Sequence, residues 1–157
     1  MILYYLDASA WIKRYCAEDG TANVAGLFDA GPAIACSALG LVEVLSTMVR
    51  KGKSGDMRPG DTRTKCREVE RDFESFHKVF LTPLLLKRAC ECARHHGLRG
   101  SDTVHLASCL ELQGQDWGSG ADIVMVSSDA ELLAGAGECG LTTRNPEKEQ
   151  VVLPATK

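Results

Sequence analysis

The sequence predicts a single-domain α/β fold, an α/β/α sandwich with a central parallel sheet of four to five strands. Short apolar runs alternate with longer stretches in which apolar residues recur at helical spacing. This alternation is typical of a parallel sheet whose two faces are both covered by helices. A length of 157 residues fits one domain with one substantial core. The content of 45% hydrophobic and 25% charged residues is that of an ordinary globular protein.

The first half of the chain is expected to supply two strands and four helices. Buried apolar runs predict the strands Ile2–Leu6 and Ala33–Cys36. Capping residues and helical spacing predict four helices: after Asp7 to about Cys16, residues 21–30 (capped by Thr21 and stopped by Gly31), from Ser37 to before Gly52, and Thr62–His77. Gly55 and Pro59 predict that the segment from Gly52 to Gly60 is a loop.

The second half repeats the alternation with shorter elements. The expected strands are Val79–Leu81, Ile123–Val126, a weakly signalled one near Leu141–Thr143, and an edge strand at residues 151–153. The expected helices are Leu84–His96 (closed by Gly97), Thr103–Leu112 (capped by Ser101 and ended by Gly114) and Ala130–Gly137, with a loop over residues 114–120. We therefore expect one domain over residues 1–146, with residues 147–157 as a tail or edge strand of the same domain.

Bulk properties exclude several classes of protein. No apolar stretch approaches the roughly 20 residues that span a bilayer. The first apolar run is short and lacks a preceding basic segment, so we expect no signal peptide and a cytoplasmic protein. The seven cysteines have no regular spacing and are expected to stay reduced. Cys90 and Cys92 would point about 200° apart on a helix, and no Cys/His pair completes a zinc site with them.

Charge is unevenly distributed along the chain. The net charge of −3 gives no overall attraction to nucleic acid. From Arg50 to Arg71, however, basic residues outnumber acidic ones. This segment is either a basic face for RNA or a solvated helix with ion pairs one turn apart, and the sequence leaves both open.

Four acidic residues that are far apart in the sequence are expected at the same edge of the predicted sheet. Asp7 ends the first predicted strand and Asp129 follows the strand Ile123–Val126, while Glu43 and Asp102 lie early in predicted helices. In an open α/β sheet, strand ends and helix starts converge at the carboxyl edge, where ligands bind. Carboxylates crowded together repel one another unless a cation lies among them, and oxygen-only ligands suit Mg²⁺ or Mn²⁺. The pattern predicts metal-dependent phosphodiester chemistry.

Each of these acids also has a purely structural explanation. Asp7 and Asp129 could be helix N-caps, and Asp102 could be placed by the helix dipole. Glu43 interrupts an apolar stretch, which favours a functional role because an unpaired buried carboxylate is unfavourable. His105, one turn after Asp102, could orient a carboxylate or contact a phosphate, although a buried histidine with satisfied hydrogen bonds is the more common outcome.

The segments that carry the four acids resemble the PIN-domain family, in particular its VapC-type ribonuclease toxins of toxin–antitoxin pairs. The matching segments, in chain order, are Tyr5–Tyr15, Ser37–Val44, Leu98–Cys109 and Val126–Leu132. The third is the most specific, with the pattern Leu-Arg-x-x-Asp-x-x-His-Leu-Ala. Two positions depart from the family pattern: Ser128 replaces an aromatic residue and Thr103 replaces an alanine. The resemblance runs from Met1 to about Pro146.

The resemblance implies a PIN-like fold and an endoribonuclease that leaves a 5′-phosphate and a 3′-hydroxyl. It implies that Asp7, Glu43, Asp102 and Asp129 hold one or two Mg²⁺ or Mn²⁺ ions, with Asp7 and Asp102 as direct ligands. Asp129 would bind directly or through water, and Glu43 through water or by orienting the nucleophile. The supporting residues around these ligands would be Ser9, Ser127 and His105. The implied partners are an RNA substrate, a cognate antitoxin and a second copy of the chain.

Two other functions remain as alternatives. A phosphatase on a similar sheet would use the first strand's aspartate as nucleophile, but it usually needs a second carboxylate two residues later, where this chain has Ser9. A catalytically inactive PIN-fold binding module would keep the fold without the reaction. Retention of all four acids favours the enzyme over the module.

Overall fold

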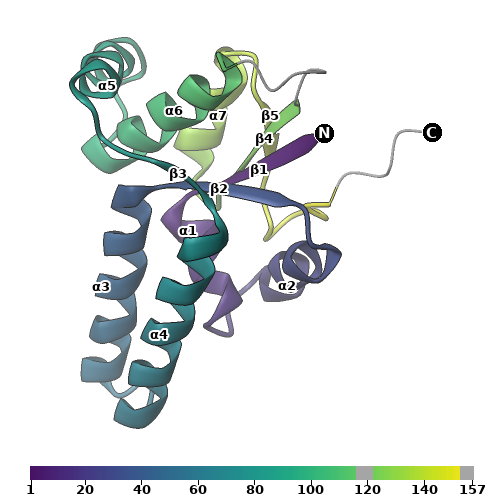
Figure 1. The fold of residues 1–157 in the computed structure, drawn as a ribbon, viewed down its shortest axis with the longest axis vertical. Helices are drawn as coiled ribbons and strands as arrows, with labels where there is room; N and C mark the ends of the chain where they lie inside the picture. Colours follow the sequence, from purple (N-terminus) through teal and green to yellow (C-terminus); the bar gives the residue numbers. More distant parts are fainter. Residues whose placement is uncertain (116–121, 153–157) are drawn as a thin grey trace.

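A five-stranded parallel sheet lies at the centre of the protein, with strand order β3-β2-β1-β4-β5 and helices on both faces (Figure 1). The structure, a computed structural model, describes residues 1–115 and 122–152. The strands are β1 (Ile2–Leu6), β2 (Ala33–Ser37), β3 (His77–Val79), β4 (Asp122–Val126) and β5 (Thr142–Arg144). The helices are α1 (Ala8–Trp11), the 3-10 helix η1 (Ile12–Arg14), α2 (Thr21–Ala30), α3 (Ala38–Ser54), α4 (Pro59–Ser75), α5 (Pro83–His96), α6 (Gly100–Gln113) and α7 (Ala130–Glu138). The predicted sandwich is confirmed.

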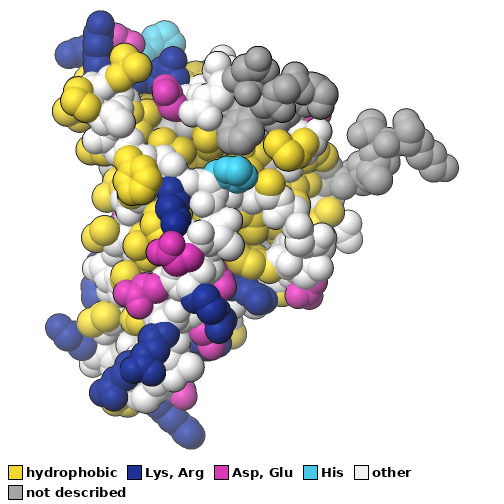
Figure 2. Space-filling view, in the orientation of Figure 1, with side chains coloured by type: hydrophobic (Ala, Val, Ile, Leu, Met, Phe, Trp, Pro, Cys, Tyr) yellow, Lys and Arg dark blue, Asp and Glu magenta, His cyan; other side chains and the backbone are white. Residues whose placement is uncertain are grey.

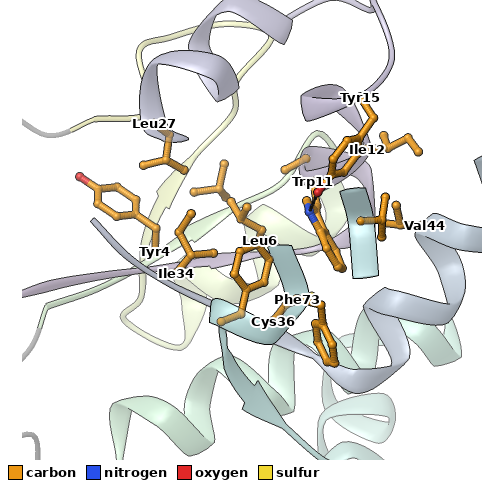
Figure 3. Packing of buried hydrophobic residues seen from close by; sticks show 14 of the residues in the cluster. Tyr4, Leu6, Trp11, Ile12, Tyr15, Leu27, Ile34, Cys36, Val44 and Phe73 are labelled. Atoms are coloured by element: carbon orange, nitrogen blue, oxygen red, sulfur yellow. Dashed lines mark hydrogen bonds between the residues drawn. The ribbon is translucent and has the colours of Figure 1, made fainter. Parts of the chain in front are cut away.

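Alternate side chains of β1 build two core layers, because successive residues of a strand point to opposite faces. Tyr4 and Leu6 pack with buried residues of α1 to α4, whereas Leu3 and Tyr5 pack with α5, α6 and α7. Trp11 lies at the centre of the first layer (Figure 3), with its ring centroid 6.0 Å from that of Phe73. Both faces of the sheet are thereby covered.

Helices α3 and α4 form a long hairpin that projects away from the sheet (Figure 1). The predicted loop from Gly52 to Gly60 is wrong at both ends, since α3 continues to Ser54 and α4 begins at Pro59. Gly52 lies inside α3 where α4 packs closely against it. A larger residue would clash, since an added Cβ would lie 2.6 Å from Thr62 Oγ1. The chain turns at Gly55, whose φ of 87° favours glycine.

Figure 2 shows Lys and Arg side chains gathered toward the far end of this hairpin. Ion pairs along its length include Lys65 with Glu68 at 2.9 Å, while Lys51 reaches Glu18 at 2.9 Å. Both features expected of the segment are therefore present, a basic end and helical ion pairs.

The third strand and the helix before it are shifted from their predicted places. Helix α4 ends at Ser75 instead of His77, and β3 is His77–Val79 instead of residues 79–81. The pairing of strands defines the start of β3, because His77 pairs with Ala35 of β2. Residues 80 and 81 lie past the strand with exposed side chains.

Three predicted helix starts are also wrong by one to three residues. Thr21 is the first residue of α2, and Gly20 with its φ of 84° is the N-cap. Ser101 lies inside the first turn of α6, which Arg99 precedes as N-cap. Helix α5 starts one residue early because Thr82 caps it by accepting a hydrogen bond from the Leu85 amide. The predicted cap Ser37 is confirmed, since its Oγ accepts from the Leu39 amide.

The other boundaries differ little. The single helix expected after Asp7 to about Cys16 is divided into α1 and η1, α7 runs one residue further than expected, and β5 begins one residue later. No strand is present at residues 151–152, where Val151 is buried in the first core layer, and Leu153 lies outside the described residues. Most of the loop expected over residues 114–120 also lies outside them. The division at residue 146 stays a prediction. Across residues 1–115 and 122–152, no helix is both long and apolar enough to cross a membrane.

Candidate active site

The sheet changes direction between β1 and β4, because the chain winds outward from β1 through β2 to β3 and then returns to β4 on the other side. Such a switch point leaves a crevice at the carboxyl ends of the strands. Leu6 pairs with Val126, so Asp7 and Ser127 follow the two strands side by side. A cavity of about 650 Å³ opens here. All four predicted acids line it: Asp7, Glu43, Asp102 and Asp129.

Asp7 is the most constrained of these acids. Its side chain is 3% exposed and accepts hydrogen bonds from the Ala10 amide at 2.9 Å, Ser127 Oγ at 2.7 Å and Ser9 Oγ at 2.8 Å. It therefore caps α1, as the structural explanation held, and also faces the cavity. Burial raises the pKa of Asp7 above its usual range, and the nearby His105 and the hydrogen bonds only partly offset this. The contacts of the carboxylate thus offset only part of the cost of burying its charge.

The serines tie the two strand ends together. Ser9 Oγ accepts from the Ser128 amide at 2.9 Å, and Ser127 Oγ accepts from the Asp129 amide at 2.9 Å. Each hydroxyl thus receives a backbone hydrogen bond and donates its own proton to Asp7. Ser9 and Ser127 therefore fix the Asp7 carboxylate against the start of α7.

Asp102 and Asp129 share one cation, the guanidinium of Arg99. Arg99 Nε lies 3.3 Å from Asp102 Oδ2, and Nη2 lies 3.0 Å from Asp129 Oδ2. Asp129 also caps α7 through the Leu132 amide at 2.9 Å. Burial, with repulsion from Asp129, raises the pKa of Asp102, and Arg99 counteracts only part of this rise. Because Arg99 is 77% exposed, it lies over the acids from the solvent side.

Glu43 is held by a buried hydrogen-bond chain. Its Oε2 lies 2.7 Å from His105 Nε2, and His105 Nδ1 lies 2.8 Å from the Tyr5 hydroxyl. Both rings are buried, so His105 is a satisfied core histidine and an orienting group at once. A carboxylate only accepts hydrogen bonds, so Nε2 is the donor to Glu43, and Nδ1 continues the chain to the Tyr5 hydroxyl, which carries one proton. Burial raises the pKa of Tyr5 well above its usual range, which keeps that proton on the hydroxyl.

The donors of the cavity suit a hard divalent cation. Among the described residues that line it are six carboxylates and three Lys or Arg side chains, so negative charge is in excess. Burial is the main cause of the raised pKa values of Asp7 and Asp102, and for Asp102 repulsion from Asp129 adds to it. Within residues 1–115 and 122–152, no three His, Cys, Asp or Glu side chains are close enough to hold one ion in this conformation. In this conformation Asp102 and Asp129 pair with Arg99, and Glu43 pairs with His105.

The structure thus brings all seven predicted site residues to one cavity wall or its immediate support, although the role of each stays a prediction. The sequence reasoning missed several further residues of the cavity: Lys13, Glu18, Arg50, Arg99, Ser128 and Glu147. For Lys13 a signal existed, because it is a single charge after the apolar Ala10-Trp11-Ile12 run. For Glu147 there was none, since it lies in a polar tail without a motif.

The chain is similar in sequence and in fold to known proteins. The PIN domain family model matches residues 4–138. Ribonuclease VapC45 of Mycobacterium tuberculosis is 33% identical over 144 residues, which cover 89% of this chain and 93% of the relative. FitAcB from Neisseria gonorrhoeae has a similar fold, with a TM-score of 0.68 at 12% identity over 93% of this chain and 99% of that one. A toxin-antitoxin complex from Klebsiella pneumoniae gives a TM-score of 0.60 at 14% identity, over 93% and 98% of the two chains. The chain belongs to the PIN domain family.

Proposed function

We propose that this protein is an endoribonuclease, the toxin of a toxin–antitoxin pair, and that its reaction depends on Mg²⁺ or Mn²⁺. The main support for the proposal is that four acids, two that follow β1 and β4 and two in α3 and α6, converge on one cavity at the switch point of the sheet. The name of the relative supports the reaction, and the toxin–antitoxin complex among similar folds supports the biological role. The excess of carboxylates supports the ion.

In this proposal Asp7 and Asp102 hold the ion directly and Asp129 directly or through water, while Glu43 binds through water or orients the nucleophile. When bound, the ion would supply positive charge to the scissile phosphate and acidify a water molecule. Ser9 and Ser127 hold Asp7 in one orientation, so its oxygens need no reorganisation during the reaction.

The remaining side chains act around this set. His105 holds Glu43 by a hydrogen bond of 2.7 Å, and Tyr5 fixes the ring in turn. Arg99 occupies the space between Asp102 and Asp129, so it must move aside when an ion binds there. Its long exposed side chain allows this movement, which places a cation near the incoming phosphate.

The test is a digest of total RNA by purified protein with Mg²⁺, with Mn²⁺ and with EDTA, followed by mapping of the cleavage ends. We expect 5′-phosphate ends with either ion, none with EDTA, and none from Asp102→Asn. The matched control is Asp122→Asn, which makes the same chemical change at an exposed position at the other end of β4. Identical digestion by wild type and Asp102→Asn under every condition would refute the assignment.

The same experiment separates the alternatives. An inactive binding module would bind ion or RNA without producing new ends. A phosphatase would depend on Asp7 but release phosphate from a monoester. Here Ser9 Oγ donates to Asp7, and no carboxylate stands at that second position. We further propose a cytoplasmic location, a cognate antitoxin that covers the cavity and a homodimer, the last to be tested by light scattering.

A further inference from the structure

A lysine is buried in the wall of the same cavity. The Lys13 side chain is only 3% exposed, and its Nζ lies 2.8 Å from Glu147 Oε1 and 3.5 Å from Glu18 Oε2. A buried ammonium group needs such partners because desolvation disfavours its charge. Glu18 is shared with Lys51, which approaches its other oxygen to 2.9 Å. Glu147 is therefore the principal anion of Lys13.

The backbone that carries Glu147 is fixed, whereas its side chain is accessible. The Glu147 amide donates to Asn145 Oδ1 at 2.9 Å, and Asn23 Nδ2 donates to the Pro146 carbonyl at 2.7 Å. Gly20 packs so closely that an added Cβ would lie 2.6 Å from the same carbonyl oxygen. The Glu147 side chain itself is 37% exposed. Rotation of this side chain alone would remove the carboxylate and leave the wall intact.

A second donor points to the same anion. Ser128 Oγ is buried, and among the described residues no partner meets hydrogen-bond geometry with it. Lys13, and to a smaller extent Ser128, lower the pKa of the Glu147 carboxyl, so the serine hydroxyl lies beside that carboxylate. A buried hydroxyl without a good partner is unfavourable. Its place beside Glu147 allows this hydroxyl to donate to an anion that Lys13 binds.

We propose that Lys13 and Ser128 form a binding position for a phosphate of the RNA backbone next to the scissile bond, and that Glu147 occupies this position when RNA is absent. The inference rests on the proposed ribonuclease function. Phosphate and carboxylate oxygens accept the same charge-assisted hydrogen bonds, so one can replace the other on an ammonium group. Ser128 directly precedes Asp129, and both donors line the cavity that holds the four acids. A flanking phosphate therefore lies within reach of a strand bound there.

The competing explanation is a structural tether, in which the ion pair only attaches the C-terminal segment. The two explanations differ in what they predict for RNA. A tether would make Glu147→Gln less stable with no gain in RNA affinity. A phosphate position would make the same variant bind RNA more tightly, because the competing carboxylate is gone.

The experiment measures anisotropy of a short fluorescein-labelled single-stranded RNA against the Asp102→Asn protein, so that bound RNA is not cleaved. Into this protein we introduce Glu147→Gln, Ser128→Ala, Lys13→Met and the double change K13M/E147Q. The double change removes both partners together and avoids an unpaired buried charge. Glu149→Gln is the matched control, since this acid lies in the same segment but pairs with Arg144 at 3.6 Å. Melting temperatures show that each variant is folded.

We expect Glu147→Gln to lower the Kd for RNA about three- to tenfold and Glu149→Gln to leave it unchanged. Ser128→Ala should raise the Kd about threefold without loss of melting temperature, and K13M/E147Q should raise it about tenfold. The slope of log Kd against log salt should shrink by about 0.7 in the double variant, as one phosphate contact is lost. Equal Kd values in all variants, with RNA bound, would overturn the phosphate position alone. If neither the Asp102→Asn protein nor any variant made in it bound RNA, the ribonuclease function would be overturned as well.

Discussion

The replacement Asp7→Asn should abolish ribonuclease activity and at the same time stabilise the ion-free protein. Burial raises the pKa of Asp7 in the folded state above its unfolded value. The folded state therefore binds the proton more tightly than the unfolded state. The free energy of unfolding then falls as pH rises through the unfolded and then the folded pKa. The penalty therefore grows as pH rises above the unfolded pKa. Asparagine is nearly the same size and carries no charge to desolvate.

The magnitude follows from the contacts of the carboxylate. Burial of the charge costs several kcal/mol, roughly, and hydrogen bonds to a charged group return about 1.5–3 kcal/mol each. The donors are Ser9, Ser127 and the Ala10 amide, and the raised pKa shows that burial still outweighs them. Asparagine keeps the acceptor for the Ala10 amide and so keeps the cap of α1. We expect a gain of about 1 kcal/mol, which for a chain of this size raises Tm by about 2–4 °C.

The assay is thermal unfolding at pH 7 in EDTA and again with excess Mn²⁺, with Asp122→Asn as the exposed control. In EDTA only Asp7→Asn should rise in Tm. With Mn²⁺ the wild type should gain stability by mass action while Asp7→Asn does not, so the order of the two reverses. The stability difference should also vanish at a pH below the unfolded pKa of aspartate, about 3.9. A lower Tm for Asp7→Asn in EDTA, or equal stabilisation of both proteins by Mn²⁺, would refute the reasoning.

Two further changes test contacts of the site, and a third tests the packing of the C-terminal segment. Arg99→Gln should increase the affinity for Mn²⁺ about tenfold in calorimetry, because a competing guanidinium is removed, and weaker binding would show that Arg99 supports the acids instead. His105→Asn should lower kcat about 10–100-fold with little change in RNA affinity, since the shorter amide does not reach the position of Nε2 and Glu43 loses its hydrogen bond. Gly20→Ala should destabilise the fold by about 2 kcal/mol in urea unfolding, because its φ is 84° and its new Cβ would lie 2.6 Å from a backbone oxygen of the C-terminal segment. Gly26→Ala, with open space around it in α2, should be neutral or stabilising, and equal effects of the two alanines would contradict this explanation.

The fold was predictable from the sequence because each strand of the sheet is a short apolar run between helical periods. Element boundaries were predicted wrongly where tertiary contacts, which the local sequence does not show, determine the structure. Gly55 and Pro59 do mark a turn, but Gly52 stays helical because Thr62 packs against it. The strand at residue 77 begins on a histidine, and only its pairing with β2 identifies it as a strand.

The candidate site was predictable to a different depth for different residues. Asp7 and Asp129 follow apolar strands, so topology alone places them at one edge of the sheet. The cationic partner of Asp102 and Asp129 was not predictable, since Arg99 is exposed and its contacts with two carboxylates depend on the rotamer of a long side chain. The role of Glu147 was not predictable either, because its contact with Lys13 joins residues far apart in the chain.

Internal charge partners occupy the positions that ligands would take in this cavity. Arg99 stands between two acids where a divalent cation would bind, and Glu147 stands on Lys13 where we place a phosphate. Each ligand must therefore displace an internal group of like charge, which lowers its affinity but keeps the empty cavity from holding unpaired buried charge. The two displaced groups differ in what they do next. Arg99, once released by an ion, is a cation at the mouth of the cavity and attracts RNA, whereas Glu147, once released by RNA, adds negative charge to the surroundings of the ion. Ion binding should consequently strengthen RNA binding, by reciprocity RNA should strengthen ion binding, and Arg99→Gln should weaken this coupling in both directions.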